Sequence, residues 1–520
     1  MPNAVGIDLG FTKCCIAVIN GDDTIAVPVN GDEISMPSVV AYTNSKCVVG
    51  SAALLQAPLN LKHTISGVKY LIGRPFTSLP TFNDKYRTFS LINIENWPYV
   101  TVERQNQIKR ISPLQIMALI LLALKRDAET YLDETVTDVV LAVPAIFTHA
   151  QRCAAKDAAS LAGFQRITLI NESTAAALAY VMENDQECEN KRILIFDLGG
   201  GKFCASVIEL DLDIIEVLST SGSERLGGNA YDDMIMADIL KRFFSIHPDC
   251  DEQSVEPSAF YRLKIECEKV KQILNNFMEV RVFVSSFVDH IDLDVTVSRE
   301  QFEEITGCLW NQTAACVRSA LDDAHLMETD LDKIVLVGGL VNMWMVLDGI
   351  RKMFPSTPVH SPLDGHTVVA CGAAAYAAHL NGCRMKWKLL DCTARSFGIR
   401  LYDQSLMKVF PRSAVIPNER TITQNTVIDN QTSILVSVYE GEQTTDDSNL
   451  LGSYILRNLR PKSRGELAVD LKFVLDQEGM FTLTATEKGT GNVLSVETTE
   501  KRYMKRGEFE WLGADAVTLT

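Results

Sequence analysis

Two short stretches of the sequence place an aspartate before a glycine turn and a lysine after it. They read GIDLGFTKCCIAVI at residues 6–19 and FDLGGGKFCASVIE at residues 196–209, and Asp, Leu, Gly, Lys and Cys recur at matching offsets. Glycines carry no Cβ, so the backbone N–H groups of such turns can approach phosphate oxygens. The glycines that we predict to bind phosphate are Gly10, Gly199, Gly200 and Gly201, with a third turn at Gly338 and Gly339.

Charged residues flank both turns. Asp8 and Asp197 stand at the ends of predicted strands, where carboxylates can hold a hydrated magnesium ion through water. Lys13 and Lys202 follow at equal offsets and can direct ammonium groups at phosphates. The alternatives are plain hairpin glycines, turn aspartates at the surface and lysines that point into solvent.

Alternating strands and helices must position these turns. Apolar and β-branched residues flank the glycines, so each stretch predicts a strand, a tight turn and a second strand. The repeat indicates two related lobes, and two unrelated hairpins that share turn residues are the alternative. Strand patterns at 137–147 and 333–343 alternate with helix patterns at 149–164, 262–274 and 368–380, which favours an α/β domain.

The pattern changes near residue 385. From Thr393 onward, short alternating segments separated by Gly, Asn and Asp predict an antiparallel β domain. We therefore expect an α/β domain at 1–382, a partly apolar linker at 383–392, a β domain at 393–500 and a tail at 501–520.

Composition excludes several classes of protein. The 520 residues are 47% hydrophobic, which is enough for real cores, and the net charge of −17 argues against a nucleic-acid scaffold and direct DNA binding. Thirteen cysteines without a CxxC pair predict a reducing compartment. The N-terminus predicts no export signal, and the longest apolar run, near 114–124, predicts no membrane insertion.

Many motifs in order resemble the 70-kDa heat-shock chaperone family, over nearly the whole chain to about residue 500. This resemblance implies an actin-like ATPase domain, which is a duplicated ribonuclease-H-like fold, followed by a β-sandwich that grips extended peptides. The motifs are GIDLG, MPSVVAY (36–42), VKYLIGRPF (68–76), VPAIFTHAQRCAAKDA (143–158), INESTAAALAY (170–180), FDLGGG, LGGNAYD (226–232), CEKVK (267–271), VLVGG (335–339), SVYEGE (437–442) and NLLGSY (449–454).

The resemblance also assigns roles at the nucleotide site. It implies catalytic roles for Lys69 near the γ-phosphate, for Glu172 in orienting the attacking water and for Asp197, with ATP or ADP as the bound nucleotide. Thr12 matches a phosphate-contacting hydroxyl. Glu268 and Lys271 match residues around the ribose, although a salt bridge on one helix face is the alternative.

Several positions depart from the family pattern. Phe11 and Lys202 stand where the family uses threonines, and Cys204 stands where it uses an aspartate near the metal and potassium. Further departures are Lys13, Gln272, Asn275, Leu340 and Asn342. Removing one preorganised group often costs roughly 3–4 kcal/mol of barrier, so we expect weak or lost hydrolysis. We hypothesise that the two turn lysines replace part of the lost cation sites and hold ATP with weak metal dependence.

The β domain carries the expected peptide site. The resemblance implies that Ile399, Ile434 and Val436 line a hydrophobic pocket, and that Tyr402 and Val427 lie near an arch over the peptide backbone. The alternative is that these are core residues. Lysines interrupt the apolar linker, so we expect weak coupling between the domains.

The resemblance implies a molecular chaperone. A chain that ends soon after the β domain, without a helical lid, resembles the atypical branch that assists nascent or unfolded polypeptides at the ribosome, in the cytosol, with a J-domain co-chaperone. The alternatives are a conventional ATP-hydrolysing, peptide-cycling chaperone, a small-molecule kinase of the actin-like superfamily, and a non-enzymatic scaffold with bound nucleotide.

Overall fold

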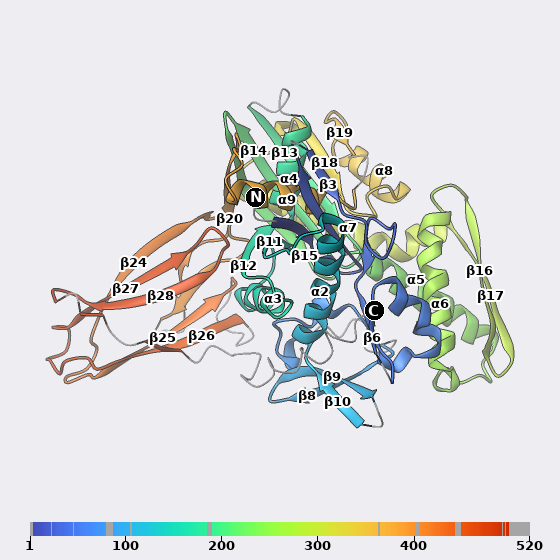
Figure 1. Cartoon of the computed structure of the whole chain (residues 1–520), viewed down its shortest axis with the longest axis horizontal. Coiled ribbons are helices and arrows are strands. Elements are labelled where there is room, and N and C mark those ends of the chain that lie inside the picture. Colours follow the sequence, from blue (N-terminus) through green and yellow to red (C-terminus); the bar gives the residue numbers. More distant parts are fainter. Residues whose placement is uncertain are drawn as a thin grey trace.

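The structure is a computed structural model of the whole chain (Figure 1). It describes residues 4–21, 23–44, 46–79, 87–104, 107–184, 190–361, 365–401, 405–442, 449–490, 492–493 and 496–498. The expected tail at 501–520 and the predicted site residue Tyr402 lie outside the described residues.

The first large sheet is built from the N-terminal part of the chain. Its order is β12-β11-β1-β2-β3, and β4 pairs with β2. The strands are β1 (Ala4–Asp8), β2 (Lys13–Asn20), β3 (Asp23–Ala26), β4 (Met36–Pro37), β11 (Asp138–Val143) and β12 (Arg166–Asn171). β1, β11 and β12 run parallel, as buried, continuously apolar strands commonly do.

The second large sheet repeats the central hairpin of the first. Its order is β19-β18-β13-β14-β15-β20-β23. The strands are β13 (Lys191–Leu198), β14 (Phe203–Asp211), β15 (Ile214–Ser223), β18 (Lys333–Val337), β19 (Val359–His360), β20 (Lys388–Cys392) and β23 (Val415–Ile416). The two stretches singled out in the sequence are the antiparallel pairs β1-β2 and β13-β14.

Helices join the two sheets and cover them. α4 (Glu172–Glu183) and α9 (Val368–Leu380) share one buried core with strands of both sheets. Their approach is close, because a Cβ at Gly372 of α9 would lie 1.8 Å from the Ala175 carbonyl oxygen of α4. The other helices are α1 (Ser51–Gln56), α2 (Pro113–Leu132), α3 (His149–Leu161), α5 (Gly228–Ile246), α6 (Pro257–Ile273), α7 (Arg299–Asp323) and α8 (Trp344–Met353).

Three smaller sheets extend the two lobes. One has the order β6-β5-β7, the second β10-β9-β8, and the third pairs β16 with β17. Their strands are β5 (Val39–Tyr42), β6 (Cys47–Val49), β7 (Thr64–Ser66), β8 (Ser90–Ile94), β9 (Trp97–Arg104), β10 (Gln107–Ile111), β16 (Glu279–Val288) and β17 (Ile291–Ser298).

The C-terminal part forms two antiparallel sheets, of orders β22-β21-β25-β26-β29 and β24-β27-β28, at the left of Figure 1. Both contribute to one hydrophobic core. The strands are β21 (Phe397–Arg400), β22 (Leu406–Phe410), β24 (Asn418–Asn425), β25 (Ser433–Glu440), β26 (Leu450–Arg457), β27 (Ala468–Leu475), β28 (Phe481–Glu487) and β29 (Val496–Thr498).

The segment expected to be a linker is partly a strand. β20 pairs parallel with β15 and antiparallel with β23, so it belongs to the second large sheet. Trp387 is buried, and Lys386 lies over its ring, 4.9 Å from the centroid. The lysines that interrupt this segment therefore do not prevent its apolar residues from packing.

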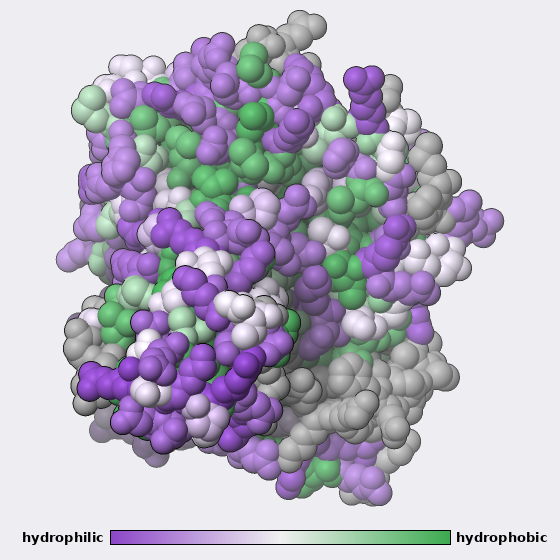
Figure 2. All heavy atoms as spheres, turned by 90° about the vertical axis from the view of Figure 1, so that its left-hand side faces the viewer, coloured by the Kyte–Doolittle hydropathy of each residue, from purple (hydrophilic) through white to green (hydrophobic). Residues whose placement is uncertain are grey.

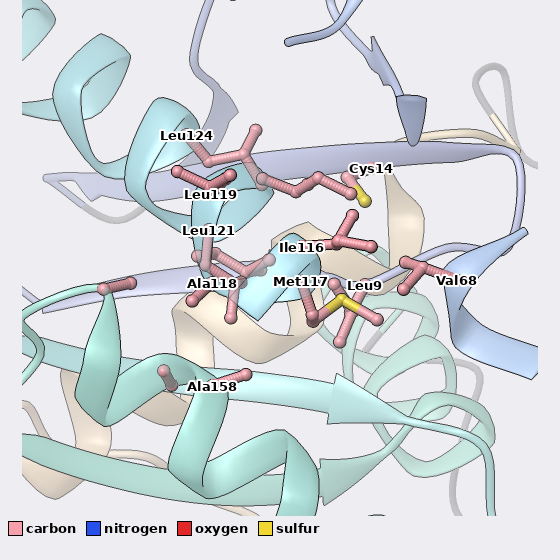
Figure 3. Packing of buried hydrophobic residues seen from close by; sticks show 14 of the residues in the cluster. Leu9, Cys14, Val68, Ile116, Met117, Ala118, Leu119, Leu121, Leu124 and Ala158 are labelled. Atoms are coloured by element: carbon pink, nitrogen blue, oxygen red, sulfur yellow. The ribbon is translucent and has the colours of Figure 1, made fainter. Parts of the chain in front are cut away.

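The neighbours of the candidate site residues are anchored in the core of the first lobe. Leu9, Cys14 and Val68 belong to one buried cluster, and Figure 3 shows them beside Ile116 and Met117 of α2. Each adjoins a charged residue of the predicted site in the sequence. On β2, adjacent side chains point to opposite faces, so the buried Cys14 directs Lys13 away from the core.

The face of the molecule that carries the C-terminal sheets is mostly polar. Figure 2 shows hydrophilic residues over most of that face, with smaller hydrophobic areas between them. Across the described residues, no helix is long and apolar enough to cross a membrane.

Candidate functional site

The turns of the two hairpins meet. A Cβ at Gly200 would lie 2.4 Å from the Thr12 hydroxyl oxygen, and one at Gly201 would lie 2.6 Å from the Phe11 ring. The Tyr70 hydroxyl donates to the Gly201 carbonyl oxygen at 2.9 Å. Side chains at these glycines would force the two lobes apart, which explains why the second turn is built from glycine.

The start of α5 and the third turn hold the second hairpin. The Gly228 and Asn229 N–H groups donate to the carbonyl oxygens of Gly199 and Gly200 at 3.0 and 2.7 Å. Gly338 has a φ of +97°, and a Cβ there would lie 2.4 Å from the Leu198 carbonyl oxygen. Gly339 lies against the His366 ring. The structure therefore places the glycines of all three predicted phosphate turns around one region.

A buried group of opposite charges lies beside the turns. The Lys69 ammonium donates to Glu172 Oε1 at 2.7 Å and to the Leu9 carbonyl oxygen. The Lys202 ammonium contacts Glu172 Oε2 and donates to Asp197 Oδ2 at 2.5 Å. Lys69 is 1% exposed and Lys202 is 5% exposed. Two lysines from different lobes therefore share the same glutamate.

Chain geometry brings these side chains together. Glu172 is the first residue of α4, and Asn171 before it ends β12. Asp197 is the penultimate residue of β13, and Lys69 lies in a short 3-10 helix at Val68–Tyr70. Glu172 and Asp197 thus lie at a helix start and near a strand end, where side chains of separate elements can converge.

The pKa values of the cluster reflect burial and pairing. Burial acts to raise the pKa of Glu172, but Lys202 and Lys69 outweigh it and hold that pKa below its ordinary value. Burial also acts to lower the pKa of Lys202, but Asp197 and Glu172 raise it well above its ordinary value. Both shifts favour the charged forms, a Lys202 ammonium and a Glu172 carboxylate.

Asp8 differs from the other carboxyl groups. Burial, with the nearby charge of Glu172, raises its pKa to about 7, against the opposing effect of Lys69. The pKa of Asp197 is also raised, chiefly by burial and against the effect of Lys202. Asp8 thus carries a proton for much of the time at neutral pH.

Lys13 and Cys204 have different surroundings. Lys13 starts β2 with an exposed side chain, so its predicted contact with ATP stays a prediction. Cys204 is buried, and its sulfur lies 3.3 Å from the Thr220 hydroxyl. Burial raises the pKa of this thiol, so it is neutral at the position where the family pattern has a carboxylate.

The predicted ribose residues are not both buried. Lys271 is buried and donates to the carboxylate of Asp232 on α5 at 2.7 Å and to the Gly228 carbonyl oxygen at 2.9 Å. Glu268 is exposed. Lys271 thus pairs with another helix, and our sequence reasoning missed Asp232, although it ends the motif LGGNAYD.

The predicted peptide residues fall into two groups. Ile399, Ile434 and Val436 belong to the buried core of the C-terminal sheets, which was the alternative for them. Val427 is 66% exposed, next to the exposed Ile428. Burial gives the three core residues a role in packing, and the predicted contacts of all four residues with a peptide stay predictions.

Our sequence reasoning also missed the contact between α3 and the C-terminal sheets. The His149 N–H donates to Glu440 at 2.9 Å, and Lys156 pairs with Glu478 at 2.6 Å. Buried Arg152 donates to the Glu478 carbonyl oxygen at 3.3 Å. These residues lie in the quoted stretch 143–158, but no short-range pattern could have shown partners about 300 residues away.

A cavity of about 690 Å³ lies at this contact. Its lining includes Arg152, Asn171, Thr174, Tyr376, Asp391 and Glu478 and none of the hairpin glycines. Thr174 donates to Asp391 at 2.5 Å, which joins α4 to β20. The cavity therefore belongs to the contact with the C-terminal sheets and not to the glycine turns.

The charges around Asp197 and Glu172 do not fit a magnesium ion bound directly to these two carboxylates. The Lys202 ammonium already binds oxygens of both Asp197 and Glu172. Within the described ranges, no group of three or more His, Cys, Asp or Glu side chains is arranged to hold a metal ion. A divalent ion at Asp197 would meet an ammonium at contact distance, and like charges so close repel strongly.

Two lobes with duplicated hairpins, a mixed α/β structure and helices shared between two sheets are consistent with an actin-like ATPase domain. A family model described as Hsp70 protein matches residues 4–518. The chain therefore belongs to the 70-kDa heat-shock family, whose members generally bind ATP or ADP, unfolded polypeptides and co-chaperones.

Curated relatives agree with this assignment. A heat shock 70 kDa protein of Neurospora crassa is 34% identical over 524 residues, which cover 99% of this chain and 81% of the relative. Heat shock 70 kDa protein 2 of Paracoccidioides lutzii is 33% identical over 525 residues, which cover 99% of this chain and 80% of the relative.

Proposed function

We propose that this chain is an atypical chaperone or co-chaperone that binds ATP and hydrolyses it weakly or not at all. It assists nascent polypeptides at the ribosome, in the cytosol, together with a J-domain partner. One observation carries the proposal of weak hydrolysis: Lys202 occupies the oxygens of Asp197 and Glu172. Those carboxylates are then engaged with an ammonium and not with a metal ion or water.

Two further features support weak hydrolysis. Cys204 supplies a neutral thiol where a carboxylate would help to hold a cation, and Phe11 fills the space beside Gly201. Phosphoryl transfer depends on cations and water held in line, and each lost preorganised group costs roughly 3–4 kcal/mol of barrier. Nucleotide binding depends less on that alignment, so it survives these changes.

The C-terminal sheets support the chaperone role. We propose that the two sheets with a common core form a β-sandwich that contacts extended polypeptide. Val427, Ile428 and Leu435 expose apolar side chains on it. Main-chain hydrogen bonds together with a few apolar contacts are a general way of binding extended peptides.

A single-turnover ATPase assay with the purified chain tests the weak hydrolysis. We expect ATP to bind and to be hydrolysed slowly, with little stimulation by a J-domain protein. Strong J-domain stimulation would favour the conventional peptide-cycling chaperone instead. Tight nucleotide binding with no hydrolysis and no effect of nucleotide on peptide release would favour the scaffold.

Sedimentation with purified ribosomes tests the ribosomal role. We expect the chain to co-sediment with translating ribosomes when a J-domain protein is present, and to release them at high salt if the contact is electrostatic. Absence from the ribosomal fraction under all these conditions would contradict this part of the proposal.

A further inference from the structure

The Lys202 ammonium lies between two carboxylates of different elements. It contacts Glu172 Oε2 from α4 and Asp197 Oδ2 from β13, and it is almost fully buried. Buried charges are costly unless they are paired and hydrogen-bonded. An ammonium held in this way between two carboxylates neutralises them as a metal ion would.

Counting charges shows that the cluster is complete without a metal ion. Lys69 and Lys202 supply two positive charges, and Glu172 and Asp197 accept from them. Asp8, whose carboxyl lies near both lysines, is partly exposed and is not among these ion pairs. Without nucleotide, the two lysines balance Glu172 and Asp197, so these two carboxylates need no metal ion for charge balance.

Both ammonium groups retain capacity for a phosphate. A lysine has three N–H donors. The contacts of Lys202 with Glu172 and Asp197 use two of them, and those of Lys69 with Leu9 and Glu172 use two of its own. The glycine turns lie beside this cluster, since Lys202 directly follows Gly201. Each ammonium thus has one N–H beyond these contacts, and the Lys69 ammonium also lies 4.9 Å from the centroid of the Phe11 ring, in the first turn.

We propose that Lys202 is a tethered cation that replaces the metal ion of this site, so that the site takes ATP or ADP as the metal-free polyanion. The inference rests on the proposed nucleotide binding and adds the form of the ligand. A site of this kind differs from one that binds nucleotide only as the magnesium complex.

The test is a calorimetric titration of the full chain with ATP, once with magnesium and once with excess EDTA. We expect the wild-type Kd to agree within about twofold between the two conditions. For Lys202→Thr, the Kd in EDTA should rise by about tenfold or more, and magnesium should recover most of the loss, because Asp197 and Glu172 then become available to a metal ion.

Controls separate charge from folding. Lys191→Thr removes a partly exposed lysine of β13 that pairs with Asp332 at 3.1 Å, and it should leave both titrations unchanged. Lys202→Arg keeps the charge and should keep metal-independent binding. If Lys202→Thr does not fold, as judged by thermal unfolding, Lys202→Met takes its place because it keeps the length of the side chain without its charge.

The possible outcomes distinguish a failure of the tethered cation from a failure of nucleotide binding itself. Wild-type binding that requires magnesium overturns the tethered cation but leaves nucleotide binding intact. Metal-independent binding by both wild type and Lys202→Thr also overturns it, since Lys202 would then not be the cation. Absence of ATP binding under both conditions overturns the nucleotide-binding proposal and this inference together.

Discussion

The two hairpins share sequence and register but not charge placement. Asp8 pairs with Cys15 across the first hairpin, and Asp197 pairs with Cys204 across the second. The lysine five positions after each aspartate is exposed in the first hairpin and buried in the second. In the first lobe, the lysine that joins the buried cluster is Lys69, which lies outside the hairpin, in the 3-10 helix Val68–Tyr70.

The residues around each lysine explain the difference. In the first hairpin, the Lys13 backbone pairs with Pro37 of β4, and Cys14 turns inward, 3.1 Å from the Ser38 hydroxyl. In the second, three glycines precede Lys202, and the Lys202 ammonium contacts Glu172 of α4. A duplicated motif therefore fixes the backbone, while turn residues and neighbouring strands decide which lysine enters the site.

The largest expected effect is on stability, through the glutamate that both lysines share. Glu172→Ala should lower the free energy of unfolding by about 3–5 kcal/mol, because it leaves buried ammonium groups with one carboxylate fewer. Urea denaturation measures this. Glu266→Ala, which removes a partly exposed pair with Lys269, should cost less than about 1 kcal/mol. Equal losses of unfolding free energy in the two variants would contradict a larger stabilisation by the buried cluster around Glu172 than by a surface ion pair.

The next effect is the pH dependence contributed by the first hairpin. The folded-state pKa of Asp8, about 7, lies above its unfolded value of 3.8, so the folded chain binds the extra proton between them. The contribution of Asp8 to the free energy of unfolding is therefore largest at low pH. It falls as pH rises toward 7, by at most about 1.4 kcal/mol per pH unit.

Asp8→Asn should remove this contribution. Urea unfolding in EDTA, without nucleotide, should show the variant gaining stability relative to wild type as pH rises from about 5 to about 8. A constant difference between the two proteins over this range would contradict the raised pKa.

A smaller effect is expected on hydrolysis when the family residues are restored in the second hairpin. Lys202→Thr with Cys204→Asp should raise the single-turnover ATPase rate in magnesium by about tenfold, since it exchanges the ammonium for a cation site with one more carboxylate. Cys204→Ser is the matched control and should not change the rate. An unchanged rate in the double variant would place the loss of activity elsewhere, for example at Phe11.

The smallest effect is expected from the first-hairpin lysine. Lys13→Thr should weaken ATP binding by no more than about threefold, because an exposed ammonium is screened by solvent. The same titration as for Lys202→Thr measures it. A loss as large as that of Lys202→Thr would show that the two hairpins act alike after all.

Much of the fold could be predicted from local pattern. The repeated aspartate, glycine and lysine residues are local signals, and both hairpins lie where they were expected. The helix pattern expected at 149–164 corresponds to α3, which spans His149–Leu161. The switch to antiparallel strands after Thr393 is likewise visible in the alternation of the sequence.

Contacts over long sequence distances could not be predicted in the same way. The pairing of Lys202 with Glu172 depends on how two lobes approach, and offsets within one hairpin contain no information about it. The equal offsets of Lys13 and Lys202 even predicted similar roles. Ile399, Ile434 and Val436 were ambiguous because a core residue and a pocket residue have the same apolar pattern.

The ratio of magnesium to nucleotide in the complex is the measurement that tests the tethered cation most directly. The chain would be saturated with ATP in the presence of magnesium, separated rapidly from free ligand, and analysed for nucleotide by chromatography and for magnesium by elemental analysis. The account predicts bound nucleotide with far less than one magnesium ion per nucleotide. One magnesium ion per bound nucleotide would contradict it.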